Sequence, residues 1–313
     1  MAKKKGLNKY NAPKIAMGTA FLLAVSKGTV GLMTGSIAII GSAFDSMLDI
    51  LTSAINFIMI KKADEPPDSD HPFGHGKFEA YASLLQSIII LAIGVSLLYG
   101  AYHKLKVSDP IDVTPLALGV MVLSILASLF ITALLRHTAK KENSQALHAD
   151  ALHYAVDVAA NACVLLALLA VKLTGLGWLD PVFGAVIAVY IMWSALKLHF
   201  DTLKIILDRR IPADKLALVQ NALNKFKDYQ VDYHRLRTRT DGSRIFADVH
   251  LTLCRKLTLQ EAHDFVDILE SEFPESSVDM MIHPEPCPCP GGENCRADAI
   301  RTLIKEYAGS KKC

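Results

Sequence analysis

Long apolar runs separated by short polar breaks dominate the first two thirds of the chain. A helix needs about 20 apolar residues to cross the hydrocarbon core of a bilayer. Six runs reach that length: roughly residues 14–33, 37–60, 78–102, 113–136, 146–173 and 178–206. Short turns at residues 35–36, 108–110 and 175–177 join them in pairs. The pattern predicts six transmembrane helices.

The last third of the chain has the shorter periods of a folded soluble domain. Residues 213–227 show helical periodicity, and residues 234–240 and 245–253 alternate on either side of a turn at 240–243, as in a β-hairpin. Thr258 and Glu261 form a capping-box pattern that opens a second helix, and a last strand ends before Pro284. This order predicts a small α+β domain with its helices on one face of a sheet.

Composition places the boundary between the two parts. The chain is 51% hydrophobic with a mean hydropathy of +0.30, too apolar for an ordinary soluble protein. Charged residues make up about 15% of residues 1–206 and about 31% of residues 207–313. We therefore expect a membrane domain over 1–207, a cytoplasmic α+β domain over 208–290 and a flexible, cysteine-containing tail over 291–313. The net charge of +2 gives no reason to expect a nucleic-acid partner.

Positive charges indicate the orientation in the membrane. Lysine and arginine gather before the first span, between the second and third, and between the fourth and fifth. Such loops stay in the cytoplasm, which places both termini there, although Lys104 and Lys106 lie on the opposite side. No small-residue cleavage site follows the basic N-terminus, so we interpret it as a cytoplasmic flank rather than a removable signal.

Two pairs of ionisable residues interrupt the apolar spans. Asp45 and Asp49 lie four apart in the second span, and His153 and Asp157 have the same spacing in the fifth. On a helix, each pair lies on one face, one turn apart. Together they offer three carboxylates and one imidazole, enough for a tetrahedral divalent-metal site. The alternative is that each residue pairs with a polar neighbour or reaches the interface.

Three further residues in the spans have weaker patterns. Asp150 lies on the face of His153 and Asp157, one turn nearer the cytoplasm, and could line an access path. His148 lies near the expected start of its helix and fits an interfacial position. For Lys27, in the first span, the favoured interpretation is that its ammonium group extends toward the membrane surface, and a functional role is the alternative.

The pattern favours transport over catalysis. Catalytic zinc sites keep one position open for water, whereas four protein ligands would fill this one, which disfavours a membrane metallohydrolase. Aspartate and histidine lose protons when they bind metal and regain them on release, so the site suits exchange of metal for protons. No G-x-x-x-x-G-K-[ST] loop for ATP occurs. A metal-sensing scaffold without transport would need the same ligands and stays open.

These features together resemble the cation diffusion facilitator family. Six spans, the segments DSMLD and HYAVD, and the loop HPFGHGKFE carry the resemblance, which covers about residues 14–286 and is greatest to the bacterial zinc and ferrous-iron efflux pumps. The resemblance implies a homodimer in the bacterial inner membrane with a ferredoxin-like, metallochaperone-like cytoplasmic domain. It also implies that Asp45, Asp49, His153 and Asp157 form the transport site, and an aspartate at position 45 resembles members that accept zinc, cadmium or ferrous iron.

The resemblance implies two further metal sites and one ion pair. Asp68, His71 and His75 match a site in the loop after the second span, with Asp70 as a rival ligand for Asp68. Lys77 and Asp208 match a structural ion pair. In the cytoplasmic domain the matching metal ligands are His234, His250, His263, His283 and Glu285, where close relatives have aspartate at the last position. Without the resemblance, the favoured interpretation of each set would be ordinary polar or interfacial residues.

The cysteines of the tail depart from the family pattern. Cys287, Cys289 and Cys295 have the spacing C-x-C-x5-C, and thiolates bind zinc and other soft metals. Both a flexible proline-rich extension and an accessory metal-capturing tail fit this segment. Cys163 and Cys254 are expected to be ordinary packing residues.

The sequence thus predicts a homodimeric membrane transporter rather than an enzyme. Its cargo is expected to be a divalent transition metal, Zn²⁺ first, with Fe²⁺, Cd²⁺ and Mn²⁺ as alternatives, exchanged for protons. Zn²⁺ or a similar ion would also be the regulatory ligand, and we expect no organic cofactor and no ATP.

Overall fold

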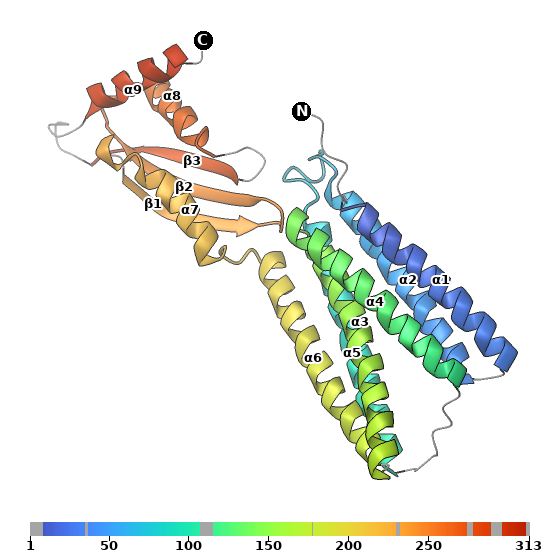
Figure 1. Cartoon of the computed structure of the whole chain (residues 1–313). Helices are drawn as coiled ribbons and strands as arrows, with labels where there is room; N and C mark the ends of the chain where they lie inside the picture. The colour runs from blue at the N-terminus through green and yellow to red at the C-terminus, as the bar shows by residue number, and fades with distance from the viewer. Residues whose placement is uncertain are drawn as a thin grey trace. The chain divides into compact units, whose positions relative to one another are not determined.

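The computed structural model describes residues 9–34, 37–106, 115–176, 178–229, 232–273, 278–288 and 296–310. The chain divides into two compact units, residues 1–206 and 207–313, and each is described by itself. The first unit is helical and the second contains a small sheet (Figure 1). The turns expected at 35–36 and 108–110 lie outside the described residues.

In the part of the chain that the structure describes, the first unit contains six long helices. They are α1 (Asn11–Thr34), α2 (Ile37–Ala63), α3 (Lys77–Lys106), α4 (Pro115–Glu142), α5 (Gln145–Thr174) and α6 (Leu179–Ile206). Among the described residues, five stretches are long and apolar enough to cross a membrane: Asn11–Met33, Ala43–Ala63, Lys77–Lys106, Val122–Glu142 and Pro181–Ile206. The remaining helix, α5, carries the ionisable residues of the fifth expected span.

The packing of the six helices places α5 in the interior. The closest pairs are α1 with α2, α3 with α6, and α4 with α5. Helix α5 also contacts α2, α3 and α6, so it has neighbours on several sides. Side chains on α5 can therefore meet residues of α2 away from the surrounding lipid.

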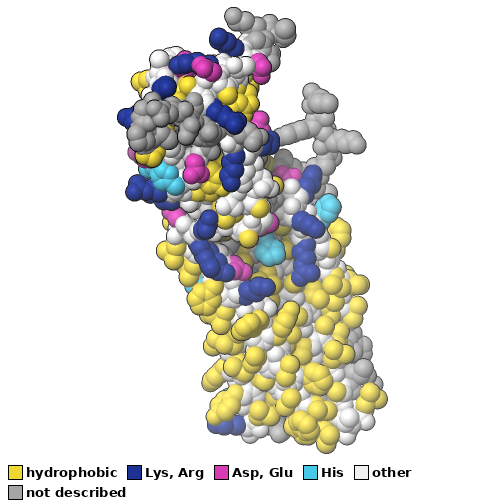
Figure 2. Space-filling view, turned by 90° about the vertical axis from the view of Figure 1, so that its left-hand side faces the viewer, with side chains coloured by type: hydrophobic (Ala, Val, Ile, Leu, Met, Phe, Trp, Pro, Cys, Tyr) yellow, Lys and Arg dark blue, Asp and Glu magenta, His cyan; other side chains and the backbone are white. Residues whose placement is uncertain are grey.

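Polarity in this unit is arranged for a membrane. Large apolar side chains such as Phe21, Leu22 and Trp193 are exposed, whereas Ser53 and Gln86 are buried. Figure 2 shows a broad hydrophobic surface over the helical unit, bordered by lysine and arginine side chains toward one end. Hydrocarbon can solvate the apolar exterior, and the polar interior is available for chemistry.

The second unit follows the predicted order of elements. It contains α7 (Ala213–Asn224), a short 3-10 helix η1 (Lys227–Tyr229), β1 (Asp232–Thr240), β2 (Ile245–Leu253), α8 (Leu259–Glu270), β3 (Val278–Pro286) and α9 (Ala297–Ser310). The sheet order is β1-β2-β3, with β1 antiparallel and β3 parallel to β2. The α+β class predicted from the sequence is confirmed.

One face of the sheet carries the hydrophobic core of this unit. Val249 and Leu251 of β2 pack with Val219 of α7, Phe265 of α8 and Ile300 of α9. Alternate residues of a strand point to opposite faces, so His250, between Val249 and Leu251, faces away from that core. The register pairs His250 with His234 on β1 and with His283 on β3. Three histidines therefore lie in a row across the sheet.

Local chemistry fixes the hairpin and the start of α8. The Asp241 carboxylate accepts hydrogen bonds from the backbone N–H groups of Ser243 (2.9 Å) and Arg244 (2.7 Å). Gly242 has a φ of 106°, a conformation that glycine adopts without steric cost. At α8, the Thr258 hydroxyl and the Glu261 side chain form the predicted capping box.

The segment expected to be a flexible tail contains a helix. Ala297–Ser310 form α9, which packs on α8 and contributes the fully buried Ile300 to the core. Arg301 of α9 donates hydrogen bonds to Glu261 (2.6 Å) and to the carbonyl of Lys256 (3.2 Å). Burial of an apolar face and this ion pair hold α9 in place, so the flexible tail expected over 291–313 does not extend through it.

Candidate metal centres

The first candidate centre lies between α2 and α5. His153 Nε2 is 2.9 Å from Asp49 Oδ1 and 4.0 Å from Asp157 Oδ2. One ligand atom from each of the three residues lies within 4.8 Å of the others. His153 is buried and the two aspartates are half-buried. The i, i+4 spacing on α5 and the α2–α5 contact bring these groups together.

The donor atoms of this cluster suit a divalent cation. Within the described part of the chain, Nδ1 of His153 and Oδ2 of Asp157 are buried and have no hydrogen-bond partner. Leaving such atoms unpaired is costly, and a cation can compensate carboxylate oxygens at this position. One imidazole with carboxylates is a ligand set that zinc and related ions accept.

Asp45 lies apart from the other three residues. It is one helical turn before Asp49 on α2, but its side chain is exposed and does not join the cluster of ligand atoms. Its part as a fourth ligand stays a prediction.

A chain of polar groups extends from this centre along α2 and α5. Asp150 is fully buried, and the Ser53 hydroxyl lies 3.4 Å from both of its carboxylate oxygens. The hydroxyl groups of Ser53 and Tyr154 are 3.2 Å apart. Ser53 was not singled out from the sequence, although it lies four residues after Asp49 and so extends the same helical stripe.

Lys27 does not reach for the membrane surface as expected. Its side chain is only 7% exposed, and Nζ donates a 2.9 Å hydrogen bond to the buried hydroxyl of Ser46 on α2. The bond turns the ammonium group inward, toward the helix that carries Asp45 and Asp49.

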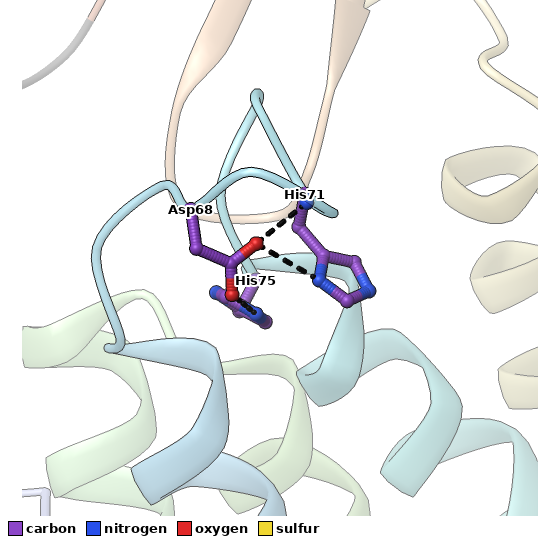
Figure 3. Close-up of side chains that lie close together, drawn as sticks. All are labelled: Asp68, His71 and His75. Atoms are coloured by element: carbon purple, nitrogen blue, oxygen red, sulfur yellow. Dashed lines mark hydrogen bonds and ion pairs between the residues drawn. The ribbon is translucent and has the colours of Figure 1, made fainter.

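The second candidate centre is in the loop between α2 and α3. Figure 3 shows that one oxygen of the Asp68 carboxylate faces His71 and the other faces His75. Asp68 Oδ1 is 3.3 Å from His71 Nδ1, and Asp68 Oδ2 is 3.3 Å from His75 Nε2. One ligand atom from each of the three residues lies within 4.8 Å of the others. Asp70, the rival ligand, does not belong to this cluster.

Backbone hydrogen bonds hold the Asp68 carboxylate in place and stabilise its charge. The N–H of His71 donates to Asp68 Oδ1 at 2.6 Å, and the N–H of Asp70 donates to the same atom at 3.0 Å. The bond from His71 is the main reason that the pKa of Asp68 is lowered. The carboxylate is therefore ionised at neutral pH, the form that binds metal.

The third candidate centre lies on the sheet face opposite the core. Glu285 Oε1 is 2.6 Å from His250 Nδ1, and Glu285 Oε2 is 3.2 Å from His234 Nε2. The bond with His250 is the main cause of a lowered pKa of Glu285. His283 lies beside them, with its Nε2 3.8 Å from Glu285 and its ring 4.9 Å from that of His250. Close relatives have aspartate at this position, and the longer side chain of Glu285 still contacts the histidines.

One expected ligand of the sheet centre does not join its cluster. His263 is exposed on α8 and pairs with Asp267 at 3.7 Å, outside the cluster of His234, His250 and Glu285. Within the helical unit, Lys77 donates to the carbonyl of Ile206 at 3.4 Å. Within the second unit, Asp208 lies 3.8 Å from Arg239. The Lys77–Asp208 ion pair remains a prediction.

The cysteines give no further metal cluster among the described residues. Cys163 donates to the carbonyl of Phe183, and Cys254 is buried, as packing residues would be. Cys287 is half-buried, and Cys289 and Cys295 lie outside the described residues.

Comparisons with known proteins agree with the fold. Residues 14–207 match the cation efflux transmembrane domain, and residues 211–287 match the cytoplasmic domain of cation efflux proteins, a dimerisation domain. The cation-efflux pumps FieF of Yersinia pestis (strain Pestoides F) and Yersinia pseudotuberculosis (serotype O:3, strain YPIII) are each 31% identical to this chain over 276 residues. The alignments cover 87% of this chain and 91% of each relative.

Both domains match in the expected order, and the relatives match over nearly their whole length. Members of this family are transporters rather than enzymes, so the metallohydrolase alternative is dropped. The chain belongs to the cation diffusion facilitator family and is a multi-pass membrane transporter for cation efflux.

Proposed function

We propose that the protein exports a divalent transition metal, Zn²⁺ in the first place, from the bacterial cytoplasm in exchange for protons. It works as a homodimer in the inner membrane, with both termini in the cytoplasm. Residues 1–207 form the transport domain and residues 208–290 the regulatory domain. Fe²⁺, Cd²⁺ and Mn²⁺ are the alternative cargoes.

The observation that carries this proposal is the cluster of Asp49, His153 and Asp157 between α2 and α5. Asp45 joins it as fourth ligand when the metal binds. A mixture of imidazole and carboxylate ligands suits ions between hard and soft. Each ligand must be deprotonated to bind the ion and can be protonated to release it, which couples metal movement to proton movement in the opposite direction.

The other two centres have supporting roles in this proposal. Asp68, His71 and His75 bind a second ion at the cytoplasmic membrane surface. His234, His250, His283 and Glu285 bind regulatory metal between the cytoplasmic domains of the dimer, with His263 contributing from α8. This metal neutralises carboxylate charge and holds the two domains together, so the transport rate rises with cytoplasmic metal.

An uptake assay tests the transport function. The protein is reconstituted into vesicles that contain a metal-sensitive dye, a pH gradient is imposed, and Zn²⁺, Fe²⁺, Cd²⁺ and Mn²⁺ are compared. We expect gradient-dependent uptake of Zn²⁺ that is lost in Asp49→Ala. Uptake that persists in Asp49→Ala would contradict the assignment of the transport site, and uptake without dependence on the gradient would contradict proton exchange.

A double variant tests regulation. His250→Ala with His283→Ala removes two imidazoles of the sheet site and leaves the membrane ligands in place. We expect the sigmoidal or threshold dependence of rate on metal concentration to be lost. A wild-type dependence in the double variant would refute the regulatory role.

A further inference from the structure

A lysine that is not one of the proposed metal ligands is buried beside the proposed transport site. Lys27 lies on α1 with 7% of its surface exposed. Its Nζ donates a 2.9 Å hydrogen bond to Ser46, which is 1% exposed on α2. A charged group in a membrane interior is costly unless it is compensated by other groups. A neutral hydroxyl does not supply that compensation.

The compensating charges are the carboxylates of the site. Ser46 follows Asp45 directly and precedes Asp49 by three residues, so the bond holds the ammonium group at the level of these two aspartates. Asp49, Asp157 and Asp45 are all close enough to interact electrostatically with Lys27. The ammonium group therefore lies among the charges that the cargo ion must also neutralise.

The positive charge of Lys27 acts against the cargo ion. Two cations near the same carboxylates repel each other, and each weakens the attraction of the carboxylates for the other. A bound divalent ion and Lys27 therefore compete for the same negative charges.

We propose that Lys27 is a fixed counter-cation of the transport site that lowers its affinity for the divalent ion and so allows the ion to leave. This inference rests on the proposed transport function and names a positioning residue, not a further ligand. An ion held by four protein ligands in a low-dielectric interior would dissociate slowly, whereas transport needs release. A neighbouring positive charge supplies the required weakening without removing a ligand.

Binding and transport measurements on the full chain test the role of Lys27. Lys27→Met keeps the length of the side chain and removes the charge, and Lys27→Arg keeps the charge. We expect Lys27→Met to tighten Zn²⁺ binding at the site lost in Asp49→Ala by about tenfold or more. In vesicles its KM and its maximal rate both fall, while Lys27→Arg stays near wild type. Lys14→Met, which removes an exposed lysine from the same helix, changes neither quantity.

A separate variant distinguishes charge from packing. Ser46→Ala removes the hydrogen bond between α1 and α2 and leaves the ammonium group, so its Zn²⁺ affinity is expected to change less than that of Lys27→Met. Zn²⁺ binding that is unchanged or weaker in Lys27→Met would overturn the inference. The inference would also fail if Lys27→Met and Lys27→Arg changed the Zn²⁺ affinity by the same amount. If Lys27→Met does not fold, Lys27→Gln serves as the uncharged variant. If Asp49→Ala abolishes uptake while Lys27→Met binds and transports Zn²⁺ as the wild type does, the role of Lys27 is refuted. The proposed transport function then still stands.

Discussion

At the scale of single residues, each of the three centres combines imidazole nitrogen with carboxylate oxygen. In the loop and sheet centres one carboxylate lies between two histidines, so each of its oxygens meets a different ring. Hydrogen bonds to Asp68 and Glu285 lower the pKa of both carboxylates, which keeps them charged at neutral pH. Both carboxylates are therefore in the charged form that a cation would need.

Asp68 and Asp70 offer a matched test of the loop centre. Asn in place of Asp68 can still accept the backbone hydrogen bonds of His71 and Asp70, so the loop keeps its shape while the charge is lost. We expect Asp68→Asn to weaken Zn²⁺ binding at the loop by at least about tenfold, since even indirect partners of a metal contribute that much. Asp70→Asn is the control and should bind as wild type. Isothermal titration measures both, and equal losses would contradict the choice of Asp68.

Sequence spacing could predict which side chains share a helix face, but not where each side chain points. Asp49, His153 and Asp157 meet as their i, i+4 positions imply. Asp45 has the same spacing and is exposed, because the rotation and packing of α2 decide which turn faces α5. Lys27 was expected at the membrane surface, and only its contact with Ser46 reveals the inward direction.

At the scale of helices and strands, close packing of α3 on α6 depends on a residue without a side chain. A Cβ at Gly94 would lie 2.6 Å from Cγ of Met192 and 3.4 Å from the carbonyl oxygen of Ala188. The 2.6 Å contact requires either the Met192 side chain or the neighbouring helix to move. Gly94 thus allows the two backbones to approach, as small residues do between membrane helices.

Alanine at two glycines of α3 tests this contact. We expect Gly94→Ala to lower the stability of the helical unit by about 1–3 kcal/mol, the usual cost of overpacking. Gly100→Ala is the control, because nothing lies within 4 Å of its Cβ position and alanine favours the helix. Thermal unfolding in detergent compares them, and a Gly94→Ala protein as stable as Gly100→Ala would show that α6 adapts freely.

The contact between α8 and α9 predicts a dependence of stability on pH. Hydrogen bonds from Arg301 and from the backbone of Thr258 lower the pKa of Glu261 to about 2, from 4.5. A carboxyl group whose pKa is lowered by folding stabilises the folded state above its unfolded pKa. This contribution should be complete above pH 4.5 and be lost as the pH falls toward 2.

Thermal unfolding of residues 207–313 between pH 5 and pH 2 measures this effect. Glu261→Gln should remove part of the decrease in Tm over that range, and Glu306→Gln, which removes an exposed carboxylate from α9, should leave the decrease unchanged. Identical pH profiles of Glu261→Gln and wild type would show that the pair with Arg301 does not stabilise the domain.

Sequence patterns predicted most helices and strands, and α9 is an element that they missed. The long helices of the helical unit, the hairpin and the capping box follow from apolar length, alternation and local hydrogen bonding. The residues Ala297, Ile300, Ile304 and Tyr307 have the i, i+3, i+7 spacing of an amphipathic helix, and three of them pack into or against the core. The cysteines, prolines and glycines before residue 296 suggested a flexible tail and concealed this periodicity.

At the scale of the whole molecule, the two units divide the work that a transporter needs. The helical unit exposes apolar side chains and buries polar ones, so the cation can be held inside while lipid contacts the outside. The cytoplasmic unit has a separate hydrophobic core and a candidate metal site on the other face of its sheet. Composition alone predicted this division, because the density of charge changes where the last long helix ends.

The most direct test of the account is to measure proton movement and Zn²⁺ uptake together in the same vesicles. Two buried or half-buried histidines of the helical unit make a matched pair: His153 of the α2–α5 centre and His199 on α6, which contacts Ser87 at 3.1 Å. The account predicts that Zn²⁺ uptake and opposite proton flux are both lost in His153→Ala and both retained in His199→Ala. Zn²⁺ uptake in His153→Ala at the wild-type rate, or uptake without any proton flux, would contradict it.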